Sequence, residues 1–356
     1  MLDHIRTLVE TESPSADEAA LHRSADVVAA LGTQVLGTPP QRDGIHLTWR
    51  FGGPTRVLVL CHHDTVWPIG SLRTHPFEVV DGILRGPGCF DMKTGLVMAL
   101  HAIAELPDRT GVTLLVTGDE EIGSPGSRAL IEAAATGAKA AFVLEASGPG
   151  GALKTERKGS AGYSLRVHGK AAHSGLEPER GHNAGVELAH QVLAIATLGD
   201  AALGTTVTPT VLSAGTTRNT VPALAEVAID VRAATPGELS RVELALRALQ
   251  PVDPAIRLEL STQSHRPPMT SESSAALFAR ASKLAAGLGL APLTKTAVGG
   301  GSDGNLTAGM GVPTLDGLGA VGGGAHADDE HVVVAEIPGR TALLAALIAD
   351  AIAEGE

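Results

Sequence analysis

Three short apolar segments of this chain end in histidine or carboxylate side chains. The segments are residues 56–61, 112–117 and 141–144, and the side chains that follow them are His62, Asp64, Glu120, Glu121 and Glu145. Imidazole and carboxylate groups bind metal ions, and both can transfer protons. Because carboxylates that lie close together repel one another, a bound cation is the simplest explanation for such a cluster. The pattern therefore indicates a metal site.

Two further candidates lie in predicted loops. Asp91 follows Gly-Pro-Gly-Cys-Phe and precedes an Ala/Leu-rich segment, where an aspartate is most often the N-cap of a helix. His326, in Gly-Ala-His-Ala-Asp, adds a second imidazole far downstream. Residues two apart in a strand share a face, so Asp64 can orient His62 as a metal ligand, although a His-x-Asp pair alone is also typical of a polar turn. Cys61 is expected on the opposite face.

The overall composition excludes several classes of partner. The chain has 356 residues, with 27 Lys and Arg against 39 Asp and Glu, which gives a net charge of −12. A nucleic-acid footprint or a polybasic membrane anchor needs clustered cations, so we expect no nucleic-acid partner and no membrane partner. A chain of this length predicts one large or two ordinary domains.

The cysteine content and the apolar segments predict a cytoplasmic protein. Cys61 and Cys89 are too few for a disulfide framework, which favours a reducing compartment. The first residues form an acidic amphipathic pattern that is not typical of a signal peptide. The longest apolar stretch, residues 342–353, is interrupted by Asp350 and is too short to cross a membrane.

The first 150 residues alternate between β-branched and Ala-rich segments. Strands are predicted at residues 45–51, 56–61, 112–117 and 141–144, and helices at 17–31, 93–105 and 127–135. Such alternation predicts an α/β sheet that is covered by helices on both faces. Open α/β sheets bind their ligands at the carboxyl ends of the strands, which is where the histidine and carboxylate residues lie.

A different pattern begins near residue 159. It predicts a strand at 162–168, a helix at 184–198, strands at 206–214 and 223–233, a helix at 237–249 and a strand at 256–262. This order, β-α-β-β-α-β, is the split unit of a ferredoxin-like domain. The first pattern then resumes with a helix at 274–288, a glycine-rich loop at 299–305, a strand at 312–315 and a helix at 340–353. We therefore predict one domain formed by 1–158 and 265–356, and a second domain, 159–264, inserted into it.

Nine motifs, in order along the chain, resemble those of the co-catalytic zinc amidohydrolase and metallopeptidase family. They are HHDTV, GPGCFDMKTG, TGDEEIGS, LEAS, GKAAHSG, RNTVP, DVR, GGGSDG and GAHADDE. The family includes glutamate carboxypeptidase, aminoacylase, acetylornithine deacetylase and succinyl-diaminopimelate desuccinylase, and the glutamate carboxypeptidase branch is the most similar. The resemblance implies a zinc-peptidase-like catalytic domain, a mixed sheet flanked by helices, with an inserted lid and dimerisation domain. Met92 departs from it, since many members have a second acid after the aspartate, and the cis peptide of the family falls on Asp91-Met92.

The resemblance also implies a metal content and a set of roles. Two Zn²⁺ ions would bind to each chain, and Co²⁺ would substitute for them. The implied ligands are His62 and Glu145 for one ion, Glu121 and His326 for the other, and Asp91 as a bridge. Asp64 would orient His62, and Glu120 would be the general base that takes a proton from water and passes it to the leaving amine.

The implied substrate contacts come mainly from the inserted domain. His173 would polarise the scissile carbonyl from the partner subunit of a homodimer, and Asn219 would share that role. Arg232 would bind a substrate α-carboxylate, and Gly300 and Gly301 would also contact substrate. Without the resemblance, His173 is typical of a surface histidine and Arg232 of an ion-paired residue at the edge of a strand.

The function implied is hydrolysis of the amide bond of N-acyl or N-aminoacyl amino acids with a free carboxylate. An aminoacylase or deacetylase that acts on N-acyl amino acids is the alternative, and a non-catalytic metal-dependent binding protein on the same scaffold is another. A thiol hydrolase built on Cys61 or Cys89 is disfavoured, because Cys61 faces away from His62. The basic cluster of Lys154, Arg157 and Lys158 fits either a contact to an acidic substrate side chain or a solvated loop.

Overall fold

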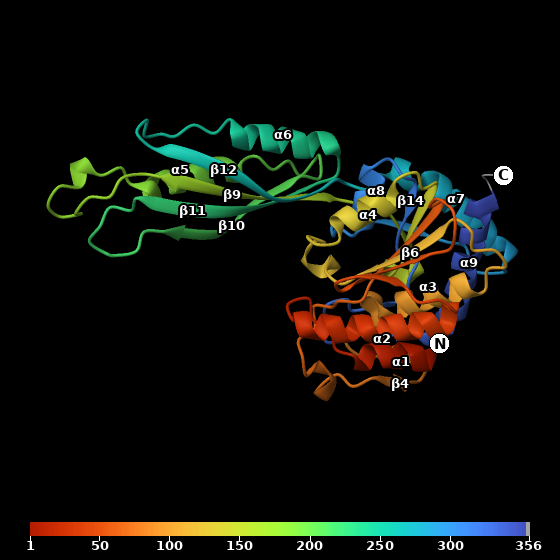
Figure 1. Cartoon of the computed structure of the whole chain (residues 1–356). Coiled ribbons are helices and arrows are strands. Elements are labelled where there is room, and N and C mark those ends of the chain that lie inside the picture. Colours follow the sequence, from red (N-terminus) through yellow and green to blue (C-terminus); the bar gives the residue numbers. More distant parts are fainter. Residues whose placement is uncertain (354–356) are drawn as a thin grey trace. The chain divides into compact units, whose positions relative to one another are not determined.

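The computed structural model describes residues 1–353 and divides them into two compact units (Figure 1). Unit 1 comprises Met1–Arg157, Met269–Val298 and the chain from Ser302 onward, and unit 2 comprises Lys158–Pro268 with Gly299–Gly301. Of the predicted segment 265–356, residues 354–356 lie outside the described residues. Each unit is described by itself below.

A six-stranded mixed sheet forms the centre of unit 1. In spatial order its strands are β1 (Gln41–Asp43), β2 (His46–Arg50), β6 (Val112–Thr117), β3 (Val57–His62), β7 (Ala140–Val143) and β14 (Thr314–Leu315). The last four strands are parallel, and β2 is antiparallel to β6. The carboxyl ends of β3, β6 and β7 therefore meet at one edge of the sheet.

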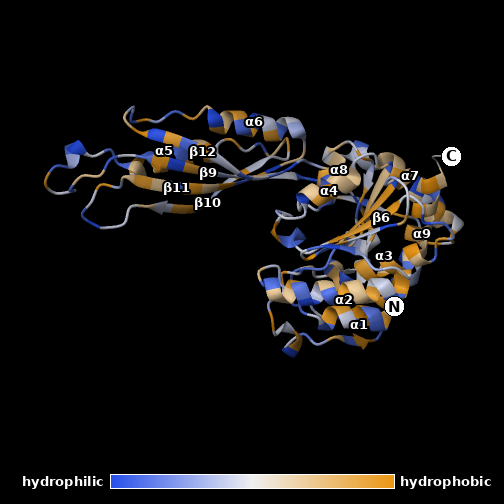
Figure 2. Ribbon diagram, in the orientation of Figure 1, coloured by the Kyte–Doolittle hydropathy of each residue, from blue (hydrophilic) through white to orange (hydrophobic). Residues whose placement is uncertain are grey.

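Helices cover both faces of this sheet, as the sequence predicts. They are α1 (Leu2–Glu10), α2 (Glu18–Leu36), α3 (Thr94–Ala104), α4 (Arg128–Ala135), α7 (Ser271–Gly287), α8 (Gly304–Gly309) and α9 (Ile337–Ala353). In β3, Val59 and Cys61 join the core that includes α3 and α9, whereas Leu58 and Leu60 pack with α4 and α8. Both sides of β3 are thus buried, and the strands around β6 are correspondingly hydrophobic in Figure 2. The predicted direction of Cys61 is confirmed.

Helix α2 extends beyond its predicted end at residue 31. A Cβ atom at Gly32 would lie 2.3 Å from the ring of the buried Trp49, so this glycine gives the indole room against the helix. The helix ends instead at Gly37, which has a φ of 76° and adopts the left-handed conformation of a helix C-cap. Gly32 therefore serves packing and does not end the helix.

Smaller elements complete unit 1, and the sequence did not predict most of them. A four-stranded sheet contains β15 (Gly322–Gly323), β16 (His331–Val333), β5 (Ile83–Arg85) and β4 (Glu78–Val80), and a parallel pair contains β8 (Leu153–Arg157) and β13 (Lys295–Val298). The apolar stretch near the C-terminus is the buried helix α9, with Leu343, Leu344 and Leu347 in the core. Among residues 1–353, no helix has the length and apolar character needed to cross a membrane.

Unit 2 has the predicted β-α-β-β-α-β order. Its elements are β9 (Gly159–His168), α5 (Ala184–Ala196), β10 (Thr206–Ala214), β11 (Leu224–Ala233), α6 (Pro236–Arg247) and β12 (Arg257–Arg266). The strands form an antiparallel sheet in the order β10-β11-β9-β12. Alternate residues of β9 and β11 pack with α5 and α6 in a separate core, whereas the other face of the sheet carries polar residues such as Arg166 and Glu226. One covered face is typical of an antiparallel sheet.

Candidate metal centre

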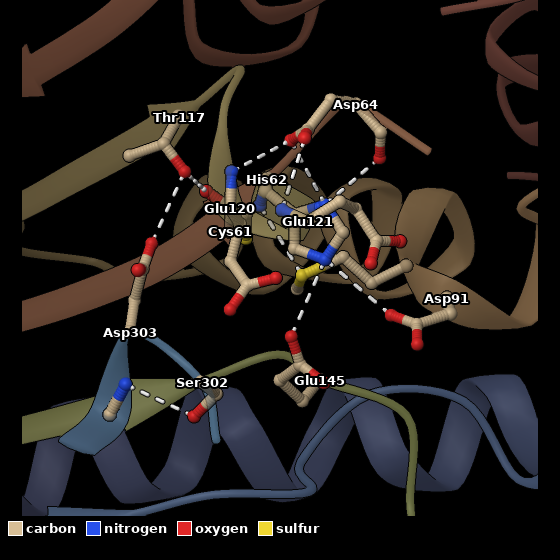
Figure 3. A network of polar contacts seen from close by, with 12 residues as sticks. Cys61, His62, Asp64, Asp91, Thr117, Glu120, Glu121, Glu145, Ser302 and Asp303 are labelled. Carbon is tan, nitrogen blue, oxygen red and sulfur yellow. Dashed lines mark hydrogen bonds and ion pairs between the residues drawn. The ribbon is translucent and has the colours of Figure 1, made fainter. Parts of the chain in front are cut away.

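The predicted histidine and carboxylate residues meet at the carboxyl edge of the unit 1 sheet. His62 is the last residue of β3, Glu120 and Glu121 lie in a short 3-10 turn after β6, and Glu145 follows β7. Since these three strands are adjacent and parallel, their ends bring the side chains together (Figure 3). The structure thus places residues from distant parts of the chain in one cluster.

His62 lies at the centre of the first group. Its side chain is 2 % exposed, and its Nε2 atom lies 3.4 Å from Glu145 Oε1 and 3.5 Å from Asp91 Oδ1. Asp91 is not the N-cap of α3, because that position belongs to Lys93. The Asp91-Met92 peptide bond is cis, as the resemblance implies. The carboxylate of Asp91 therefore contributes to the cluster and leaves the helix uncapped.

The second group forms around His326. Its Nε2 atom lies 3.1 Å from Glu121 Oε2 and 3.5 Å from Asp91 Oδ2. Asp91 consequently presents one carboxylate oxygen to His62 and the other to His326. A carboxylate shared in this way can bridge two cations.

The donor atoms fit a metal site. Within the described part of the chain, Nε2 of His62 and Oδ1 of Asp91 are both buried and have no hydrogen-bond partner. Candidate ligand atoms lie within 4.8 Å of one another in two sets, His62 with Glu120 and Glu145, and His62 with Asp91 and Glu121. Unpaired buried polar atoms are costly unless another group satisfies them. Imidazole nitrogen and carboxylate oxygen together suit divalent ions such as zinc.

The electrostatics of the cluster reflect its crowded carboxylates. Burial lowers the pKa of His62, but the carboxylates of Asp64, Asp91 and Glu145 raise it well above its usual value. The carboxylates of Asp91 and Glu121 raise the pKa of His326 to about 10. Because only a neutral imidazole can coordinate a metal, protons and metal ions compete for these nitrogens.

Asp64 connects His62 to the turn that follows β6. The Nδ1 atom of His62 lies 3.0 Å from the main-chain oxygen of Asp64 and 3.4 Å from its Oδ1. The Asp64 carboxylate also accepts hydrogen bonds from the main-chain N–H groups of Glu120, at 3.2 Å, and Glu121, at 3.1 Å, and from the hydroxyl of Ser15, at 2.7 Å. Asp64 is fully buried. It can therefore hold both the imidazole and the Glu120-Glu121 turn in place, as contacts of this kind do around metal ligands.

Arg157 supports Glu145, a contact that the sequence did not predict. Its side chain is 3 % exposed, with Nε 2.6 Å from Asp316 Oδ2 and Nη2 3.3 Å from Glu145 Oε2. Lys154 Nζ lies 3.8 Å from the same Glu145 oxygen. Both basic residues belong to β8, so the solvated-loop interpretation is wrong for them. The alternation of Leu153 and Thr155 with the charged residues Lys154 and Glu156 was the sequence signal available for a strand.

Comparison with known families identifies the chain. Residues 58–350 match the model of peptidase family M20/M25/M40, which spans all the ligand candidates above. The chain belongs to the M20 family. The family resemblance found in the sequence is thereby confirmed, and membership makes this chain a metallohydrolase rather than a non-catalytic binding protein.

The M20 relatives of this chain are named for different hydrolytic activities. Carboxypeptidase G2 from a Pseudomonas species is 31 % identical over 92 % of this chain and 79 % of its own length. A succinyl-diaminopimelate desuccinylase from Methylorubrum populi is 31 % identical over 86 % of this chain and 84 % of its own. An M20 family metallo-carboxypeptidase from Sulfolobus solfataricus has the same fold, with a TM-score of 0.72, 18 % identity and 98 % of each chain covered.

The remaining predicted residues of this M20 chain lie in unit 2. His173 and Asn219 are exposed and occupy neighbouring loops, since Ser174 N donates to Asn219 O at 3.0 Å and His173 pairs with Thr220. Arg232 forms two 3.0 Å hydrogen bonds to Asp230, so the ion pair that its strand position favours is present. Their catalytic and substrate-binding roles stay predictions.

The GGGSDG motif is divided between the units. Gly300 and Gly301 belong to unit 2, and their contact with substrate stays a prediction. Asp303 is buried in unit 1, where it accepts a hydrogen bond from Thr117 Oγ1 at 3.2 Å and contacts Ser124 Oγ. The acidic residue of this M20 motif therefore supports the end of β6, directly before the turn that carries Glu120.

Proposed function

We propose that this chain is a dinuclear zinc hydrolase that cleaves the amide bond of N-acyl or N-aminoacyl amino acids with a free carboxylate. The observation that carries the proposal is the position of Asp91, whose two oxygens face His62 and His326 at 3.5 Å each. The similarity to carboxypeptidase G2 over 92 % of this chain supports the carboxypeptidase branch.

The ligand groups divide between two ions. His62 and Glu145 would hold one ion, Glu121 and His326 the other, and Asp91 both. Such ions, when bound, polarise a substrate carbonyl and lower the pKa of water. Co²⁺ accepts the same nitrogen and oxygen donors and would replace Zn²⁺.

Glu120 is the proposed general base. Its carboxylate lies within 4.8 Å of the candidate ligand atoms of His62 and Glu145, and its main-chain N–H is bound to Asp64. A buried carboxylate held in this position can take a proton from the attacking water and deliver it to the leaving amine. Its 8 % exposure limits competing contacts with bulk solvent.

Unit 2 would provide the substrate contacts and a dimer interface. We infer that His173 and Asn219 stabilise the developing oxyanion and that Arg232 binds the substrate carboxylate through its planar guanidinium. Strand β10 lies at an edge of the sheet, and its Val211 and Leu212 are 68 % and 52 % exposed. Uncovered edges of this kind commonly pair with another chain, which supports a homodimer formed through unit 2.

A second candidate function is deacylation of N-acyl amino acids with small acyl groups. It is favoured by the desuccinylase from Methylorubrum populi, whose similarity covers 86 % of this chain. Zinc-loaded protein should therefore be screened against dipeptides, aroyl-amino acids and N-acetyl or N-succinyl amino acids, with release of free amine as the readout. Preference for small acyl groups favours the second candidate, and no hydrolysis of any of these amides contradicts both.

A further inference from the structure

Glu330 is a buried acidic residue that the chemistry proposed above does not use. Its side chain is 3 % exposed, and it lies four positions after His326 in the same loop. A buried carboxylate is costly unless hydrogen bonds or cations compensate its charge. The contacts of Glu330 therefore require an explanation.

Both oxygens of Glu330 accept hydrogen bonds from the segment that contains Asp91. Oε1 accepts from the main-chain N–H groups of Phe90, at 2.8 Å, and Asp91, at 3.0 Å. Oε2 accepts from the N–H of Gly88, at 2.9 Å, and from the indole Nε1 of Trp67, at 2.6 Å. All four partners are N–H donors, so the side chain must act as an acceptor-only carboxylate. One side chain thus fixes three main-chain groups around Asp91.

The loop that carries Glu330 is itself tightly folded. Ala327 N donates to Gly324 O at 2.9 Å, and Glu330 N donates to Ala327 O at 3.0 Å. A Cβ atom at Gly324, where φ is 74°, would lie 2.7 Å from Glu330 N, so a larger residue does not fit there. The position of Glu330 is consequently coupled to that of His326, which this short loop also carries.

We propose that Glu330 is a positioning residue that sets Asp91 relative to His326 and so determines the affinity for both metal ions. The inference rests on the proposed function, because it assumes that Asp91 bridges two ions. The hydrogen bond from the main-chain N–H of Asp91 to Glu330 fixes the backbone from which the bridging side chain extends. Contacts that orient metal ligands typically contribute about 10- to 100-fold to metal affinity.

Glu330→Gln provides the test, with Glu187→Gln as a matched control. A glutamine keeps the size of the side chain but directs an NH₂ group at N–H donors, so it cannot accept all four hydrogen bonds. Glu187, in unit 2, is also a buried carboxylate, and it accepts hydrogen bonds from the main-chain N–H groups of Val252 and Asp253 and from Gln191. Glu187→Gln therefore disrupts a comparable set of hydrogen bonds, but at a residue that does not contact the proposed metal ligands.

Two measurements separate positioning from general stability. Competition with a chelator should give a Zn²⁺ affinity that is about 10- to 100-fold weaker in Glu330→Gln than in wild type. The visible absorption of the Co²⁺-loaded variant should also change, since it reports the ligand geometry. Glu187→Gln should lower the melting temperature while both metal readouts stay at wild-type values.

The outcomes distinguish this inference from the proposed function. Wild-type affinity and absorption in Glu330→Gln, or equal losses in Glu187→Gln, would overturn the positioning role while wild-type protein still binds two ions. Wild-type protein that binds no metal would overturn the proposed function, and this inference with it. Where Glu330→Gln does not fold, Trp67→Phe decides, because it removes one donor from the same carboxylate. It should weaken Zn²⁺ binding in the same direction, and unchanged binding overturns the proposal.

Discussion

Nε2 of His62 and Oδ1 of Asp91 lie 3.5 Å apart, both buried and both without a hydrogen-bond partner among residues 1–353. The two atoms come from the end of β3 and from the segment before α3. Two buried polar atoms that face each other without a hydrogen bond favour a ligand that binds both, and a divalent cation does so. This pair therefore suggests the most direct test of the metal centre.

Purified protein should contain close to two zinc or cobalt ions per chain, and Asp91→Ala should lose both. The reason is that Asp91 faces each imidazole with a different oxygen. Elemental analysis after dialysis measures the stoichiometry, and Asp108→Ala, which removes an exposed carboxylate in the same unit, serves as the control. An Asp91→Ala protein that retains one tightly bound ion would show that this carboxylate is not shared.

Glu120→Ala should keep both metal ions and lose about 100-fold or more in kcat, the usual scale for a positioned proton carrier. Loss of the base leaves the five proposed ligands in place, so metal content and catalysis should respond separately. Steady-state kinetics and elemental analysis on one preparation provide the two readouts. Near-normal turnover in this variant would remove Glu120 from the proposed role.

Mixed subunits should reveal whether His173 acts across a dimer interface. If it does, a heterodimer of His173→Ala and Glu120→Ala subunits contains one intact site, because each subunit supplies what the other lacks. Differently tagged subunits allow the heterodimer to be purified, and part of the activity should return relative to either inactive parent. Purified heterodimers that stay inactive would place His173 in the site of its own subunit or outside catalysis.

Arg232→Lys should reduce kcat/KM for free-acid substrates. The expected loss of transition-state stabilisation is about 1.5 to 3 kcal/mol, the scale of a hydrogen bond to a charged group. Lysine cannot reproduce the two parallel hydrogen bonds of a guanidinium to a carboxylate. Matched methyl esters or amides of the same substrates should be much less affected. Arg241→Lys is the control, because Arg241 forms a similar pair with Glu238 in the same unit. Equal losses on acid and amide substrates would instead assign Arg232 to the fold of unit 2.

Neither cysteine should react with a thiol reagent in the native protein. Cys61 and Cys89 are 3 % and 0 % exposed, and burial raises the pKa of both thiols, so little thiolate is available. Both should react once the protein is unfolded in denaturant, which can be followed with a chromogenic disulfide. Rapid modification of the native protein with loss of activity would revive the thiol-hydrolase hypothesis.

The sequence by itself determined the strands that carry the ligand candidates and the change from one chain pattern to the other near residue 159, but it missed the smaller strands of unit 1. Short apolar segments that end in His62, Glu120 and Glu145 predict both an α/β sheet covered on both faces and its ligand-binding edge, because all these signals are local. The order of segments from residue 159 similarly predicts the ferredoxin-like unit, and the structure shows that one face of its sheet is covered. The family motifs assigned ligand roles to Asp91 and His326. Local sequence patterns alone do not distinguish Asp91 from a helix N-cap or His326 from an ordinary loop histidine.

Only the tertiary structure decided which side chains hold the ligands in place. Asp64 binds the Glu120-Glu121 turn, and Arg157 binds Glu145 from β8. Glu330 binds the Asp91 segment from a loop 239 positions further along the chain. These contacts depend on how distant segments pack, and the sequence alone presents each residue only as an isolated charge. A buried charge acquires its role from the partners that compensate it, and the fold determines which partners those are.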